Sequence, residues 1–243
     1  ADEELGVVYL PVESATGDRY GGDRPGNNLF ASSTVAVDYK TGEMRWHFQT
    51  THHDIWDWDT PSAPILATLP SGKRALIQTL KQSHLFMFDP ATGEPLFPVE
   101  ERAVPQTDVP GEWTAATQPF PMKPLPYDRQ GFQEDDLVDF TPEILALAKE
   151  AASRFRFSTS VFTPPSLFED PNDGSQGTLH LPSSTGGSNW EGAAYDPETG
   201  LLYVPSRTAT SVLSLTNEPN ASSVDYIQGG SRTPSLDGIP LVK

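Results

Sequence analysis

The segment of this sequence with the most reactive side chains is His52–Asp59, which reads His-His-Asp-Ile-Trp-Asp-Trp-Asp. Two histidines, three carboxylates and two tryptophans lie within these eight residues, directly after the strand-like segment Arg45–Gln49. Burying so many ionisable groups is costly unless they pair with each other or with a metal ion. The segment therefore indicates an acidic site with aromatic walls. The alternative is a surface turn whose acids have no chemical role.

The donor types in His52–Asp59 restrict the metal that such a site would bind. Zinc is weakly supported, because no third His or Glu lies at a helical i, i+4 spacing. Carboxylate oxygens favour Ca²⁺ or Mg²⁺ instead. The sequence contains no cysteine, which excludes disulfides, thiolate metal sites and a cysteine nucleophile.

Charge and hydropathy exclude several classes of partner. The chain has 243 residues, with 33 acidic and 16 basic side chains and a formal net charge of −17. Such a charge repels phosphate backbones and anionic lipids, so we expect no nucleic-acid partner. No apolar run approaches the roughly 20 residues of a membrane span. The N-terminal segment Ala1–Glu4 is acidic and is not a signal peptide, although one could have been removed.

A turn motif of the form Asp-x-x-Thr-Gly occurs three times, at Asp38–Gly42, Asp89–Gly93 and Asp196–Gly200. In each copy the aspartate can hydrogen-bond its own backbone, and the glycine can adopt the positive φ of a tight hairpin. The second gap is close to twice the first, which gives a period of about 50 residues, as in propeller blades. The alternative is three unrelated hairpins. The 24 prolines, 19 glycines and 10% aromatic residues also favour short strands with irregular connections.

The long interval between the second and third turns has a different character. Residues 98–140 are rich in Pro, Gln and acids without strand-like alternation, which predicts an extended surface loop. Thr141 and Pro142 are typical of a helix N-cap and first helical position, and apolar residues at helical spacing continue to about Arg156. The sequence therefore predicts an all-β fold with one short helix in a long loop. We expect this fold to form one domain over residues 1–243, with a loop and helix excursion at about 98–160.

The segment Gln49–Asp59 resembles the signature of the quinoprotein alcohol and glucose dehydrogenases, which use pyrroloquinoline quinone (PQQ). Other stretches agree with this family in order and spacing over nearly the whole chain. They are Tyr20–Leu29, Val104–Gln106, Thr117–Phe120, Phe162–Ser166 and Gly186–Trp190. The resemblance implies a partial β-propeller, with about four of the family's eight blades of four-stranded antiparallel sheet.

In this family an alanine, a glycine and a tryptophan at fixed offsets dock one blade on the next. Ala36, Gly42 and Trp46 match that docking motif. The second copy departs from it, with Met87 and Phe97 in place of the alanine and the tryptophan, and the third copy lacks the tryptophan.

The resemblance also implies roles for particular residues. Asp57 matches the catalytic base, which would take the hydroxyl proton of the substrate while a hydride moves to the quinone. Asp54 is the local alternative for that base. Lys81 matches a basic residue that contacts the quinone oxygens, and Asn189 matches an asparagine that hydrogen-bonds the cofactor. Trp190 lies beside Asn189 and belongs either to the cofactor site or to the blade core.

By the same resemblance, the cofactors are PQQ and Ca²⁺, and the metal ligands are Asp57, Asp59 and Ser14. Family members bind the metal with the asparagine of a Gly-Asn pair, and alignment places Glu13 and Ser14 at that pair. A hydroxyl is a weaker ligand than an amide carbonyl, so this substitution weakens the predicted metal site. The family's metal-binding glutamate, adjacent-cysteine disulfide and stacking tryptophan belong to blades that this chain lacks.

These features predict that the chain is part of a PQQ-dependent dehydrogenase that oxidises an alcohol, sugar or polyol. The alternative is a non-catalytic propeller-like module for binding or self-association. We expect the chain to pair with the remainder of a propeller or to form a homodimer, because an incomplete ring exposes sheet edges. Whether the chain is a fragment, a split gene product or a complete self-associating protein is left open. We also expect the isolated chain to be inactive and, by resemblance, periplasmic.

Overall fold

The computed structural model describes all residues from 1 to 243 as short strands with one α-helix. The strands are β1 (Val7–Val12), β2 (Ser33–Asp38), β3 (Met44–Gln49), β4 (Ile65–Thr68), β5 (Arg74–Thr79), β6 (Leu85–Phe88), β7 (Val99–Ala103), β8 (Thr117–Pro121), β9 (Arg156–Phe157), β10 (Ser166–Leu167), β11 (Thr178–His180), β12 (Ala194–Asp196), β13 (Leu201–Tyr203), β14 (Ser211–Thr216) and β15 (Ile227–Gln228). The helix α1 spans Pro142–Ala152, and a 3₁₀ turn spans Glu134–Asp136.

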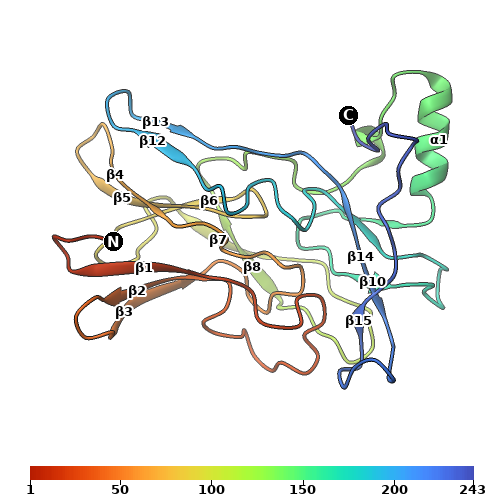
Figure 1. Ribbon diagram of the computed structural model, residues 1–243, viewed down its shortest axis with the longest axis horizontal. Coiled ribbons are helices and arrows are strands. Elements are labelled where there is room, and N and C mark those ends of the chain that lie inside the picture. Colours follow the sequence, from red (N-terminus) through yellow and green to blue (C-terminus); the bar gives the residue numbers. More distant parts are fainter.

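The strands form several small sheets that do not close into a ring (Figure 1). Two of them are antiparallel meanders, in the orders β1-β2-β3 and β4-β5-β6, while β7-β8 and β12-β13 are two-stranded hairpins. The predicted all-β fold with one short helix is confirmed. The sheets differ from regular four-stranded blades, because the fifth sheet has the order β10-β14-β11-β9 with β15 on β14. Its β10·β14 and β11·β9 pairs are parallel.

The repeated turns have the conformation that their sequence predicts. Asp38 Oδ1 accepts hydrogen bonds from the backbone N–H groups of Lys40 and Thr41, at 2.9 and 3.0 Å. Gly42 closes the turn with φ of 75° and donates its N–H to the carbonyl of Asp38. The turns at Asp89 and Asp196 repeat this pattern, each with a glycine at positive φ. The internal repeat is therefore a repeat of hairpins.

The first two meanders are joined through an aromatic contact between their repeats. The indole of Trp46 in β3 lies on the backbone of Gly93, where an added Cβ would come within 2.5 Å of the ring. Trp46 Nε1 donates to the carbonyl of Pro90 at 3.1 Å, and the Tyr9 hydroxyl donates to the same oxygen at 3.0 Å. A buried cluster that includes Phe86 and Phe88 continues this contact between the two sheets. Figure 1 shows the two meanders side by side.

The hairpin β12-β13 packs on the other side of the second meander. Gly200 faces Pro70, where an added Cβ would lie 2.6 Å from the proline ring. The Tyr195 hydroxyl donates to the carbonyl of Thr68 at 2.8 Å. The three hairpin-bearing sheets therefore follow one another in space, with the second meander in the middle.

The excursion between the second and third repeats differs from its prediction in two respects. Residues 98–140 are not loop throughout, because β7 and β8 form an antiparallel hairpin there. The helix begins as predicted, with Thr141 Oγ1 accepting from the Ile144 N–H, but it ends at Ala152 and not near Arg156. Arg156 instead begins β9. Figure 1 places α1 far from the β2-β3 and β4-β5 turns. No helix of the chain has the length and apolar character needed to span a bilayer.

We predict that Gly93→Ala destabilises the chain more than Gly42→Ala does. Both glycines have φ of 75°, so both substitutions carry the backbone penalty of about 1–2 kcal/mol for a left-handed alanine. Only the Cβ at residue 93 meets the Trp46 indole, since nothing lies within 4 Å of a Cβ at residue 42. Urea denaturation measures both free energies of unfolding. Equal losses would contradict the docking contact.

Two buried histidines make the stability of the fold dependent on pH. Burial lowers the pKa of His84 to about 4, from an ordinary value of 6.5. Burial, together with the positive charge of Arg19, lowers the pKa of His180 to about 3. Neither ring nitrogen of His180 has a hydrogen-bond partner. Both side chains are therefore held neutral in the folded chain.

We predict that the stability these two histidines contribute is full above pH 6.5 and is lost as the pH falls from 6.5 towards 4. In that range both histidines are protonated in the unfolded chain and neutral in the folded chain. Each such proton gives the free energy of unfolding a slope of about 1.4 kcal/mol per pH unit. His84→Gln and His180→Gln should each lower the slope of the free energy of unfolding against pH by about one proton relative to the wild type. Urea denaturation at several pH values measures the slope, and unchanged slopes in both variants would contradict the assignment.

Candidate functional site

In the turn after β3, aromatic and acidic residues alternate along the chain, and their side chains point in different directions. Trp56 and Trp58 are completely buried in one cluster with Phe162. Their indole N–H groups donate to the carbonyls of Thr163 and Val161, both at 2.8 Å. Because the tryptophans occupy the core side, the intervening Asp57 projects away from that core.

Asp57 and Asp59 meet the ammonium group of Lys81, which lies in the tight turn between β5 and β6. Lys81 Nζ is 3.1 Å from Asp57 Oδ2 and also bonds Asp59 Oδ2. The Lys81 and Asp59 side chains are only 8% and 11% exposed, whereas Asp57 is 21% exposed. The other oxygen of Asp59 accepts the backbone N–H of Ser14 at 2.8 Å, directly after β1. Residues that follow β1, β3 and β5 thus converge at one rim.

Arg19 is a member of this site that the sequence did not reveal. Its guanidinium lies 3.3 Å from Asp57 Oδ2 and also donates to the carbonyl of Trp56. A second cation therefore contacts the same carboxylate as Lys81. No spacing or motif around Arg19 distinguishes it from a solvated surface arginine, and a long side chain reaches its partner from a loop.

Burial and the shared cation act on the acidity of this cluster in opposite directions. Burial raises the pKa of Asp57 to about 7, although the charges of Lys81 and Arg19 oppose the rise. Burial acts in the same direction on Asp59, but the hydrogen bonds from Lys81 and Ser14 outweigh it and lower the pKa of that carboxyl. Burial would lower the pKa of Lys81, yet its bonds to the two carboxylates raise it. Asp57 is therefore the acid of this pair that more readily takes up a proton.

Asn189 and Trp190 lie on a loop that contacts Lys81 at Gly186 and Gly187. The N–H of Gly187 donates to the carbonyl of Lys81 at 2.9 Å, and Gly186 packs on the Lys81 Cα. The Asn189 side chain donates to the carbonyl of Thr185 within its own loop at 2.7 Å. Trp190 is 78% exposed. The structure thus brings Asp57 and Lys81 together, while the cofactor roles of Asn189 and Trp190 stay predictions.

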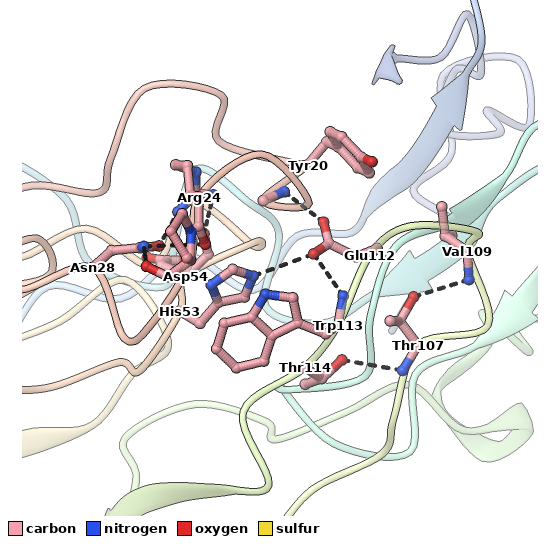
Figure 2. A network of polar contacts seen from close by, with 12 residues as sticks. Tyr20, Arg24, Asn28, His53, Asp54, Thr107, Val109, Glu112, Trp113 and Thr114 are labelled. Carbon is pink, nitrogen blue, oxygen red and sulfur yellow. Dashed lines mark hydrogen bonds and ion pairs between the residues drawn. The ribbon is translucent and has the colours of Figure 1, made fainter. Parts of the chain in front are cut away.

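The two histidines of the signature are already engaged by other residues. Glu112, in the loop between β7 and β8, lies 3.2 Å from His53 Nε2 and accepts the backbone N–H of Gly21. Figure 2 shows its contact with His53. His53 Nδ1 faces the carbonyl of Gly26, and the Trp113 ring stacks on the imidazole at 3.7 Å. His52 lies between Gln49 and Glu101, at 2.8 and 3.0 Å. Both histidines therefore fasten the signature segment to its surroundings.

The predicted metal ligands do not fit Ca²⁺ as they are arranged in this chain. Both oxygens of Asp59 are partnered, by Ser14 and by Lys81, and Lys81 also contacts Asp57. A cation bound by these carboxylates would have to displace the ammonium group. No cluster of three or more His, Cys, Asp or Glu side chains is arranged to hold a metal ion. The ligand roles of Ser14, Asp57 and Asp59 stay predictions.

A protein-family model described as the PQQ glucose/ethanol/alcohol dehydrogenase β-propeller domain matches residues 1–239. The chain belongs to this family. It is 35% identical over 207 residues to the glycerol dehydrogenase large subunit of Gluconobacter oxydans, which covers 83% of this chain and 27% of that protein. It is 32% identical over 208 residues to quinoprotein glucose dehydrogenase A of Acinetobacter calcoaceticus, which covers 81% of this chain and 25% of that protein. The chain thus spans about a quarter of these relatives.

Solved structures agree with this relationship at the level of the fold. The quinohemoprotein alcohol dehydrogenase of Comamonas testosteroni matches 97% of this chain and 30% of its own, with a TM-score of 0.56 and 18% identity. A europium-containing methanol dehydrogenase matches 93% of this chain and 32% of its own, with a TM-score of 0.54 and 18% identity.

We predict that Lys81 and Asp59 are energetically coupled in the folded chain. Lys81→Met should destabilise it by about 3 kcal/mol, because it leaves a buried carboxylate unpaired. Lys81→Met combined with Asp59→Asn should cost less than the sum of the single substitutions, with a coupling energy of about 2 kcal/mol. Urea denaturation of the four proteins completes the double-mutant cycle. Additive effects would show that the contact contributes nothing.

Proposed function

We propose that this chain forms part of a dehydrogenase that uses PQQ to oxidise an alcohol, sugar or polyol. The observation that carries the proposal is the contact of Asp57 with Lys81 at the rim where the family signature ends. Relatives named for glycerol and glucose oxidation support this class of substrate.

In the proposed reaction Asp57 is the general base. Its carboxylate is partly exposed and its pKa is raised by burial, so it is suited to take the proton of a substrate hydroxyl near neutral pH. Lys81 and Arg19 hold the carboxylate by one of its oxygens, which fixes its orientation. Asp54 is a poor candidate for the same role, because it is buried and its oxygens bond neighbouring groups.

Lys81 is also suited to contact the cofactor. An ammonium group has three N–H donors, and two of them point to Asp57 and Asp59. The third is available for a quinone oxygen, where the positive charge stabilises developing negative charge. PQQ, when bound, would supply the acceptor for the hydride that leaves the carbinol carbon of the substrate. The proton of the substrate hydroxyl passes to Asp57, and the product is a carbonyl compound.

A non-catalytic module for binding or self-association is the alternative function. Trp190 and Tyr203 favour it, because Tyr203 in β13 and Trp190 in the loop before β12 are both largely exposed. Exposed aromatic side chains at an open sheet are typical of an interface. In this case the partner is a second copy of the chain or the remainder of a propeller. A periplasmic location stays a prediction for either function.

We predict that Asp57→Asn, made in the whole natural protein that carries this chain, lowers kcat by at least 10³-fold and leaves PQQ binding nearly unchanged. The amide keeps the shape of the side chain but cannot accept the substrate proton. Dye reduction with alcohols, sugars and polyols measures turnover, and the change in PQQ absorbance measures binding. Asp38→Asn in the exposed β2-β3 turn is the matched control and should retain full turnover.

Turnover that persists in Asp57→Asn would overturn the assignment of the base. A wild-type protein that binds PQQ without oxidising any of these substrates would favour the binding module.

A further inference from the structure

We propose that Asp54 is a positioning residue for Asp57, and that its side chain clasps the backbone on both sides of the base. This inference deepens the proposed function and depends on Asp57 as the base. Asp54 does not touch Lys81 or the exposed rim. It acts through the peptide groups that carry Asp57.

The clasp consists of three hydrogen bonds to one buried side chain. Asp54 Oδ1 accepts the backbone N–H of Trp56 at 2.9 Å and that of Trp58 at 3.2 Å. These two residues flank Asp57, so the chain on either side of the base is tied to the same oxygen. Asp54 Oδ2 lies 2.8 Å from the Ser32 hydroxyl. Because Asp54 is only 2% exposed, water does not compete for these bonds.

The conformation that the clasp maintains is unfavourable without it. Asp57 has φ of 66°, in the left-handed region, which costs a residue other than glycine about 1 kcal/mol or more. His53, at the start of the same turn, has φ of 44°. A turn with two such residues persists only where its surroundings impose it. The two N–H bonds to Asp54 impose it at the position of the base.

Ser32 anchors the clasp to the sheet. It is fully buried directly before β2, where its N–H donates to the carbonyl of Glu13 and its own carbonyl accepts the N–H of Thr50. The carbonyl of Asp54 also accepts a bond from Arg24 at 2.8 Å, in the network drawn in Figure 2. These bonds fix the turn that carries Asp57 relative to the segments that follow β1 and β3. The same segments carry residues of the site.

The clasp does not depend on whether Asp54 is ionised. The backbone N–H groups of Trp56 and Trp58 can only donate, so Oδ1 must accept from them in either state. The Ser32 hydroxyl can donate to a carboxylate or accept from a protonated carboxyl. An asparagine at residue 54 can therefore replace the aspartate, with its Oδ1 on the two N–H groups and its Nδ2 donating to Ser32. An alanine cannot.

The test compares four variants of the whole natural protein with the wild type. Asp54→Ala should lower kcat by about 10²-fold, since a displacement of about 1 Å at a reacting group has that effect. KM should change less than threefold. Asp54→Asn should restore kcat to within about fivefold of wild type. In Ser32→Ala with Asp54→Asn, the buried Nδ2 of the amide loses the partner that Ser32 provides, so kcat should fall below that of Asp54→Asn alone. Ser32→Ala alone should have a smaller effect, because a carboxylate presents an acceptor on either side.

Hydrogen exchange provides a readout that is independent of turnover. Mass spectrometry of peptides spanning residues 54–59 should show exchange of the Trp56 and Trp58 amides at least tenfold faster in Asp54→Ala and near wild type in Asp54→Asn. Unchanged exchange in Asp54→Ala would overturn the clasp. Faster exchange with unchanged kcat would overturn the positioning role.

The outcomes separate this inference from the proposed function. The proposed function fails if the wild-type protein has no dehydrogenase activity or if Asp57→Asn remains active. The role of Asp54 in catalysis then fails as well. Hydrogen exchange still decides whether the clasp exists. If Asp57→Asn is inactive and Asp54→Ala is as active as the wild type, only the positioning role fails. If Asp54→Ala does not fold, the kcat of Asp54→Asn is compared with that of Asp54→Asn combined with Ser32→Ala. A higher kcat in Asp54→Asn supports the positioning role, and equal values overturn it.

Discussion

The contact on which the rest of the structure depends is the Trp46 indole against the backbone of Gly93. A side chain at residue 93 would occupy the volume of the ring, so the close approach of the two repeats requires a glycine there. The bonds from Trp46 and Tyr9 to the carbonyl of Pro90 fix the direction of the approach. Once the two meanders are joined in this way, the chain leaves β3 and β5 at the same rim. The ion pairs of Asp57 and Asp59 with Lys81 follow from that geometry.

The site formed at this rim contains as many cations as carboxylates. Asp57 and Asp59 face Lys81 and Arg19, and all four side chains are largely shielded from water. Each charge would be costly to bury alone, so each stabilises the placement of the others. The pair is asymmetric, because bonds from Lys81 and the backbone N–H of Ser14 stabilise the charge of Asp59, whereas burial is the dominant effect at Asp57. That asymmetry directs the proton affinity of the cluster to Asp57.

The sequence predicted the features that depend on local geometry. The Asp-x-x-Thr-Gly turns and the Thr141 N-cap were predictable, because their hydrogen bonds connect residues at most four apart. The hairpin of β7 and β8 was missed because β7 is exposed at nearly every position and β8 contains two prolines, so neither strand alternates in hydropathy. The contact of Arg19 with Asp57 spans 38 positions and leaves no local pattern. Sequence resemblance could bring Asp57 and Lys81 into one hypothesis, but it could not reveal what holds them.

A base on a loop is generally less well placed than a base on a strand, because loop backbone has fewer fixed partners. The turn that carries Asp57 compensates by making bonds to segments remote in sequence. The indoles of Trp56 and Trp58 bond the carbonyls of residues 163 and 161, and the guanidinium of Arg19 bonds the carbonyl of Trp56. The tryptophans of this signature therefore contribute both apolar burial and directional bonds. An apolar side chain of similar size at residue 56 or 58 would fill the core but would not bond the carbonyl of residue 163 or 161. This explains why aromatic side chains with an N–H group alternate with the acids in the segment where the proposed chemistry occurs.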